Sequence, residues 1–191
     1  MTTAQPLWTP SEQRKKSTNL FAFMERVSSK TGEVFDDYHA FYLWSVENQE
    51  TFWAEFWDYA GIIGEKGKTV LTLGKEMRDA RYFPEGRINY AENLLRRNNT
   101  AIAMVFRDEK GRERELSFQD LHAQVSKFQQ FLKDQGVEKG DRVAGYMPNM
   151  PETIIVHLAA ASLGAIWSSA SPDFGVQGLL DRFGQIEPKV L

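Results

Sequence analysis

The chain has 191 residues, of which 42% are hydrophobic and 26% are charged, enough for one hydrophobic core or for a small domain with an extension. Its formal net charge is only −3, and no segment gathers enough basic residues to favour nucleic acid as the main partner. The sequence has no cysteine, which excludes a disulfide framework and a thiolate zinc site and is consistent with a reducing compartment.

The apolar segments of the sequence suggest neither a membrane protein nor a secreted protein. The first 16 residues contain no apolar segment of the kind that a secretory signal requires. The longest apolar run, 154–167, has 14 residues, which is too short to span a bilayer and fits a buried helix leading into a strand. We therefore expect a cytoplasmic protein that has no membrane partner.

The first part of the chain is rich in aromatic residues. We expect a helix over 12–29, and from Phe35 to Tyr59 ten of 25 residues are aromatic. Phe52 and Phe56 stand four residues apart, as do Trp53 and Trp57, so the rings of each pair should stack along one side of a helix. Such rings could form a flat surface on which a ligand stacks. We favour a helical layer that docks its rings on the main domain, because each large ring buries much apolar area.

The segment 61–69, GIIGEKGKT, ends like a phosphate-binding loop but does not fit one. In the motif G-x-x-x-x-G-K-[ST] the first glycine would stand at position 62. Ile62 occupies that position, and Gly61 is one residue too far away. We interpret the segment as a flexible turn.

We place the boundary between an N-terminal extension, 1–100, and an α/β domain, 101–191, near the turn Asn98–Asn99. The runs 101–107 and 113–117 flank a Glu-Lys-Gly turn, which is typical of a hairpin. Ser117 with Asp120 three residues later predicts the start of a long amphipathic helix that stops at Gly136.

The last part of the chain alternates strands with helices. We expect strands at 142–147 and 165–170, a helix that begins at Pro151, a third helix after 171–173, and a new apolar run at 189–191. The third helix should bury one apolar stripe, Val176, Leu179, Leu180, Phe183 and Ile186. This alternation predicts parallel strands joined by right-handed crossovers, the first part of a doubly wound, largely parallel sheet.

Ligands of such sheets bind in the loops at the carboxyl ends of the strands. The loops 147–151 and 170–175 are therefore the places to look for a site, although either could be no more than a turn. His39, His122 and His157 stand far apart and match no catalytic or metal-binding spacing. No residue of the chain can be assigned as an acid, a base, a nucleophile or a metal ligand.

Four stretches carry a family resemblance: 136–152 (GVEKGDRVAGYMPNMPE), 161–191 (ASLGAIWSSASPDFGVQGLLDRFGQIEPKVL), 81–97 (RYFPEGRINYAENLLRR) and 41–62 (FYLWSVENQETFWAEFWDYAGI). They closely resemble the acetoacetyl-CoA synthetase family, within the adenylate-forming acyl-CoA synthetase superfamily. The SPDFGVQG loop and the NYAEN stretch distinguish the chain from acetyl-CoA synthetases. The resemblance covers nearly the whole chain and implies an aromatic-rich helical extension followed by the beginning of the AMP-binding domain.

The resemblance implies the N-terminal portion of an acetoacetate–CoA ligase, which uses ATP, Mg²⁺ and CoA and proceeds through acetoacetyl-AMP. The family's phosphate loop, its adenine and metal residues and its catalytic lysine would follow Leu191, so we expect these 191 residues to be inactive alone. Three alternatives stay open. They are an acetyl- or propionyl-CoA synthetase-type ligase, a non-catalytic α/β binding domain, and a helical interaction module centred on 35–59.

The resemblance also points to one loop, Ser171, Pro172, Asp173 and Phe174, as the CoA side. In the related acetyl-CoA synthetases the corresponding loop is glycine-rich and lies beside bound CoA. Only Phe174 matches that pattern by residue, and Asp173 could instead cap the helix that follows. Finally, the apolar run 189–191 looks like a strand with a free edge, through which we expect the chain to self-associate.

Overall fold

The computed structural model describes residues 7–191, so the first six positions of the N-terminal stretch considered above lie outside the described residues. The chain forms two compact units, Met1–Arg87 and Ile88–Leu191. This division comes before the expected boundary near 98–99, because helix α5 (Tyr90–Leu94) packs against helix α7 (Pro151–Ser162) of the second unit. Among residues 7–191, no helix combines the length and the apolar character needed to cross a membrane.

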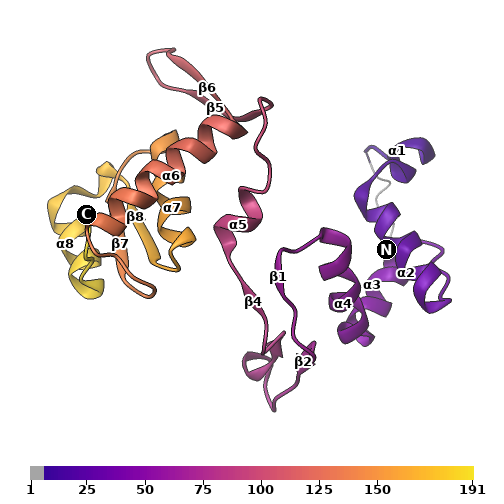
Figure 1. Cartoon of the computed structure of the whole chain (residues 1–191). Coiled ribbons are helices and arrows are strands. Elements are labelled where there is room, and N and C mark those ends of the chain that lie inside the picture. Colours follow the sequence, from indigo (N-terminus) through magenta and orange to yellow (C-terminus); the bar gives the residue numbers. More distant parts are fainter. Residues whose placement is uncertain (1–6) are drawn as a thin grey trace. The chain divides into compact units, whose positions relative to one another are not determined.

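The N-terminal unit, coloured indigo to magenta in Figure 1, is helical at first and then irregular. Its helices are α1 (Glu12–Lys16), α2 (Asn19–Thr31), α3 (Tyr38–Glu47) and α4 (Gln49–Ala60). The short elements that follow are β1 (Gly64–Glu65), β2 (Leu71–Thr72), a 3₁₀ turn η1 (Met77–Asp79) and β3 (Arg81–Tyr82). Strands β2 and β3 pair antiparallel.

The expectation of one helix over 12–29 is wrong, because the chain breaks between α1 and α2. Thr18 has an extended backbone, and its hydroxyl accepts a hydrogen bond from the Phe21 amide as the N-cap of α2. The same hydroxyl donates to the Lys15 carbonyl at 2.7 Å, which ends the preceding turn. A short polar side chain of this kind competes with the helical backbone for its hydrogen bonds, so it favours a cap over a helix interior.

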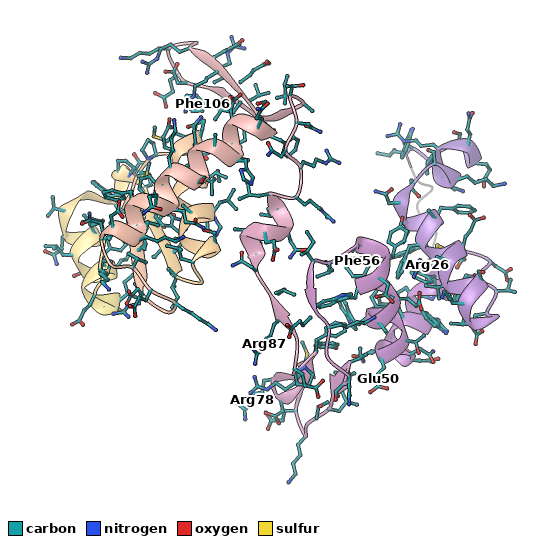
Figure 2. All side chains as sticks on the ribbon, in the orientation of Figure 1. Arg26, Glu50, Phe56, Arg78, Arg87 and Phe106 are labelled. Carbon is teal, nitrogen blue, oxygen red and sulfur yellow. The ribbon has the colours of Figure 1, made fainter. Side chains whose placement is uncertain are left out.

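The rings of the N-terminal unit form its own core. Phe23, Val27, Phe41 and Trp44 are buried there, and Phe35, Phe52 and Tyr59 pack against them. The predicted pairing of Phe52 with Phe56 is confirmed, since their rings stack at 6.2 Å and 5°. The two tryptophans instead contact rings outside α4, Trp53 that of Tyr82 and Trp57 that of Phe83. Phe56, labelled in Figure 2, also meets Phe23 edge-on. The buried rings thus stabilise this unit itself, and docking on the α/β unit stays a prediction for exposed rings such as Tyr38 and Tyr42.

The second unit contains the α/β sheet. Strand β4 (Arg87–Ile88) stands at the junction, and α5 is followed by β5 (Ile102–Arg107), β6 (Glu113–Ser117), α6 (Phe118–Asp134), β7 (Arg142–Tyr146), α7, β8 (Ile166–Ala170), a 3₁₀ turn η2 (Pro172–Phe174) and α8 (Gly175–Ile186).

Three local predictions in this unit are confirmed. Strands β5 and β6 pair antiparallel as a hairpin, in which Arg107 lies opposite Glu113. Ser117 and Asp120 form a capping box at the start of α6, with both reciprocal hydrogen bonds present. Pro151 occupies the first turn of α7, where its missing N–H leaves no backbone hydrogen bond unmade.

Strand β7 is the centre of a parallel sheet, as the doubly wound prediction requires. It pairs with β8 along its whole length, and on its other side Val143 forms a parallel bridge with Val190. The Ala144 amide donates to the Val190 carbonyl at 2.8 Å, so the terminal apolar run is joined to the sheet along one edge. The chain thus runs from β7 to one neighbour, β8, and then crosses back to the opposite side of β7.

This crossing places the two crossover helices on opposite faces of the sheet, as Figure 1 shows. Val143 points into the core shared with α6 and α7, whereas the next residue, Ala144, packs with Ala170 and Phe183 of α8. The expected stripe of α8 is only partly buried. Val176 and Leu180 are 72% and 59% exposed, and the stripe that packs on the sheet is the narrower set Leu179, Phe183 and Ile186.

Candidate functional site

The two candidate loops follow neighbouring strands and begin at the same level. Tyr146 at the end of β7 lies opposite Ala170 at the end of β8 in the parallel register. The first loop continues into α7, and the second forms η2 and then α8. Both therefore stand at the carboxyl edge of the sheet, where this architecture binds ligands.

The second loop is held by hydrogen bonds within itself. The Ser171 hydroxyl accepts from the Asp173 amide at 3.3 Å and donates to the Asp173 carboxylate at 2.8 Å. Ser171 therefore caps the 3₁₀ turn Pro172–Phe174 and not the long helix. The N-cap of α8 is Phe174, and it makes no side-chain capping hydrogen bond. The interpretation of Asp173 as the cap of that helix is therefore wrong.

Phe174 and Arg182 form the exposed surface of this loop, and Arg182 was not among the residues expected from the sequence. The Phe174 ring is 51% exposed, and the guanidinium carbon of Arg182 lies 3.9 Å from the ring centroid. One Arg182 N–H donates to the Gly178 carbonyl at 3.0 Å, which keeps the guanidinium over the ring. A cation at this distance from a ring face is attracted by the ring quadrupole.

Two glycines make the arrangement of Phe174 and Arg182 possible. Gly175 has φ +65°, which turns the chain from the 3₁₀ turn into the helix and disfavours a side chain. A Cβ on Gly178 would lie 3.2 Å from Arg182 Nη1 and 3.4 Å from Phe174 Cβ. The sequence signal for this contact is a basic residue two helical turns beyond Phe174. It predicts the contact only if the 3₁₀ turn before α8 is already known, because that turn places the Phe174 ring. The pair offers an aromatic ring and a positive charge to a ligand.

The first loop borders an open groove of about 790 Å³ between residues 148–150 and the β5–β6 hairpin. The basic side chains of the groove are largely matched by acidic ones. Arg107 pairs with Glu113, Arg112 with Asp108, and Arg114 with Glu152 at the start of α7. The groove therefore presents no excess of positive charge to a phosphate, and we keep the loop 171–174 as the better candidate.

The Gly-Lys-Thr segment, which ends like a phosphate-binding loop, does bind an anion, but that anion is a side-chain carboxylate of the same chain. The Glu85 carboxylate accepts hydrogen bonds from the Lys68 amide at 2.7 Å, the Thr69 amide at 2.9 Å and the Thr69 hydroxyl at 2.8 Å. Gly67 has φ +78°, and a Cβ there would lie 2.6 Å from Glu85 Oε2. The segment is a turn, as expected, and Glu85 occupies the donors that a phosphate would need.

These hydrogen bonds, first from the Thr69 amide and hydroxyl and then from the Lys68 amide, lower the pKa of the Glu85 carboxyl. A lowered folded-state pKa stabilises the fold above the unfolded pKa, about 4.3, and this stabilisation disappears as the pH falls through the folded pKa. We expect wild type to lose more stability than Glu85→Gln as the pH drops below about 4.3. Urea unfolding at several pH values measures this, with the exposed Glu33→Gln as the control. Parallel pH profiles for wild type and Glu85→Gln would contradict it.

Over residues 7–191, no group of three or more His, Cys, Asp or Glu side chains is placed to hold a metal ion. His157 lies between the rings of Tyr90 and Trp167, with centroid distances of 5.6 and 6.4 Å. These ring contacts are those of a side chain packed within the domain. Ligand binding at the loop 171–174 therefore stays a prediction, which rests on the position of the loop at the carboxyl edge of the sheet and on the exposed pair Phe174 and Arg182.

Two family models match the chain. Residues 91–191 match the model for AMP-binding enzyme, and residues 38–94 match the model for the acetyl-coenzyme A synthetase N-terminus. The two matches meet near α5, close to the division between the two compact units.

Proteins of one kind are similar along the whole chain. An acetoacetyl-coenzyme A synthetase of Rhizobium meliloti (strain 1021) is 48% identical over 190 residues, which are 100% of this chain and 29% of the relative. An acetoacetyl-CoA synthetase of Macaca fascicularis is 43% identical over 98% of this chain and 28% of its own length. The solved acetoacetyl-CoA synthetase from Streptomyces lividans superposes with a TM-score of 0.90 at 34% identity, over 97% of this chain and 29% of that structure. The chain thus spans somewhat less than a third of the length of these relatives.

Proposed function

Because the chain belongs to the AMP-binding enzyme family, we propose that it forms the N-terminal part of an acetoacetate–CoA ligase. The observation that carries the proposal is the 48% identity to an acetoacetyl-coenzyme A synthetase along the entire chain. The ligase would join acetoacetate to ATP, forming acetoacetyl-AMP and releasing pyrophosphate. The thiolate of CoA would then displace AMP and give acetoacetyl-CoA.

ATP, Mg²⁺ and CoA are the cofactors of this proposed reaction. A carboxylate must approach a polyanionic phosphate in the first step, so a metal ion and cationic groups have to neutralise the charge. Residues 7–191 contain no metal-binding cluster, and the Gly-Lys-Thr donors are occupied by Glu85. We therefore assign to this chain the scaffold of the sheet and one wall of the CoA side.

The proposed CoA wall is the loop Ser171–Phe174 together with Arg182. The half-exposed ring of Phe174 can stack on a flat group of the ligand, and stacking on an aromatic side chain contributes about 1–3 kcal/mol per base. The guanidinium of Arg182 has five N–H donors, of which Gly178 engages one, and it is suited to a phosphate oxygen. Asp173 is bound by Ser171 inside the loop.

A chimera tests the proposal. This chain replaces the matching N-terminal 29% of the Rhizobium meliloti enzyme, and both half-reactions are measured with acetoacetate, acetate and propionate. We expect acetoacetate-dependent pyrophosphate exchange and CoA-dependent AMP release from the chimera, and neither from the 191 residues alone. A chimera that folds cooperatively but shows no acetoacetate-dependent exchange would contradict the proposal. A preference for acetate or propionate would favour the related ligases instead.

The chimera also tests the CoA wall. Phe174→Ala should raise the KM for CoA about tenfold, which corresponds to the loss of about 1.4 kcal/mol of binding, and should leave pyrophosphate exchange unchanged. Phe131→Ala is the matched control, because that ring on α6 is similarly exposed, at 44%. Equal effects of the two substitutions would mean that the loop is structural. Self-association through the sheet edge and a cytoplasmic location both stay predictions.

A further inference from the structure

One side chain connects the end of the central strand to the loop that follows its neighbour. Tyr146 is the last residue of β7, and its phenol hydroxyl donates to the Pro172 carbonyl at 2.8 Å. The hydrogen bond spans 26 positions of sequence and ties the carboxyl end of one strand to the loop after the next. Nothing in the local sequence around Tyr146 indicates this contact.

The Pro172 carbonyl is the point at which the loop can best be held. Proline has no N–H, so the 3₁₀ turn cannot be anchored by an amide at that residue. Its carbonyl accepts from the Gly175 amide within the turn as well as from Tyr146 outside it. Within the turn, the Phe174 amide donates to the Ser171 carbonyl at 3.2 Å. Of these contacts, only the one from Tyr146 attaches the turn to the sheet.

We propose that Tyr146 is the positioning residue of the CoA wall. By holding the Pro172 carbonyl, its hydroxyl sets the level of the turn above the sheet edge. The position of the 3₁₀ turn then determines where the Phe174 ring lies beneath the Arg182 guanidinium. The inference rests on the proposed function for its consequence, since a correctly placed ring and guanidinium matter only if the loop meets CoA.

The physical consequence is a loosening of the loop without unfolding. Tyr146→Phe keeps the ring and its packing but removes the donor, while the Pro172 carbonyl keeps its bond to the Gly175 amide. Exchange of the Phe174 and Gly175 amides should therefore rise about three- to tenfold, the change expected when one hydrogen bond of ordinary net strength is lost. The rest of the sheet should keep its protection.

Hydrogen exchange of the 191-residue chain, resolved for residues 171–176, is the first measurement. Tyr59→Phe is the matched control, because its hydroxyl also donates to a backbone carbonyl, that of Asn19, at 2.8 Å, within the N-terminal unit. We expect faster exchange of the loop for Tyr146→Phe and no change there for Tyr59→Phe. Unchanged exchange in Tyr146→Phe overturns the inference and leaves the proposed function untouched.

The second measurement uses the chimera described above. Tyr146→Phe should raise the KM for CoA severalfold, with acetoacetate-dependent pyrophosphate exchange near its original rate. If the loop exchanges faster but the KM for CoA stays the same, Tyr146 does not position a CoA wall and the inference is overturned. Phe174→Ala then tells the two failures apart, because its own lack of effect would also remove the CoA wall from the proposed function.

Discussion

Phe23→Ala should lower the stability of the N-terminal unit by about 3–5 kcal/mol, the usual cost of removing a buried phenylalanine ring. The ring is 4% exposed and lies at the centre of the unit's core. It contacts four further rings, Phe41, Phe52, Phe56 and Tyr59, at centroid distances of 5.0–5.8 Å. Removing the ring leaves a cavity. It also removes the edge-to-face contacts with Phe41, Phe52 and Phe56, and such a contact contributes about 0.5–1.5 kcal/mol.

The matched control for Phe23 is an aromatic residue on the surface of the same unit. Tyr38 is 60% exposed, and its ring stacks on Tyr42. Tyr38→Ala should change stability by less than about 0.5 kcal/mol. The indole NMR signals of Trp44 and Trp167 report the two units separately during urea unfolding. A Phe23→Ala variant as stable as wild type, or a Tyr38→Ala variant equally destabilised, would contradict the assignment of the core.

Gly145→Ala should destabilise the α/β unit by about 1–3 kcal/mol through overpacking. Gly145 is buried in β7, and an added Cβ would lie 2.4 Å from Cη2 of Trp167 and 3.3 Å from the sulfur of Met147. The strand cannot move away easily, because it is paired on both sides. The tip of the Trp167 ring therefore has to leave its packed position.

A second substitution tests this cause directly. Trp167→Phe removes the ring atoms that an alanine at position 145 would strike, so the double variant should lose less stability than the two single losses added together. Gly184→Ala is the control, because a Cβ there meets nothing within 4 Å, and alanine in a helix is favoured over glycine by up to about 1 kcal/mol. Strict additivity of Gly145→Ala and Trp167→Phe would mean that the close approach is not the cause.

Part of the candidate site was predictable from the sequence alone. The alternation of elements after Gly136 predicted that the loop 171–174 follows a parallel strand, and the structure has it there. The role of Asp173 was not predictable, because a carboxylate before a helix can cap that helix or a shorter turn. Here the 3₁₀ turn intervenes, so Asp173 bonds Ser171 and the start of α8 has no side-chain cap.

Other parts of the site depend on contacts between segments far apart in sequence. Tyr146 reaches Pro172 across 26 positions, and Glu85 reaches Thr69 across 16. From its residue pattern the Gly-Lys-Thr segment is only a phosphate-loop motif with the wrong spacing. The pattern does not show that a carboxylate from a different turn, that of Glu85, accepts its hydrogen bonds. Arg182 stands over Phe174 only because Gly175 bends the chain and Gly178 leaves room.

The sequence by itself determined the elements whose signals lie within a few residues. The Ser117–Asp120 capping box and Pro151 in the first turn of α7 act through hydrogen bonds and backbone angles within one helical turn, so their meaning survives without the rest of the fold. Only the tertiary structure decided which faces are buried. Phe41 and Trp44 lie in the core of their own unit, whereas Tyr38 of the same segment is exposed. Val176 stays exposed, and Val190 joins β7 on the side opposite β8. Burial depends on which segments the chain brings together, and periodicity shows that a helix has an apolar face but not what covers it.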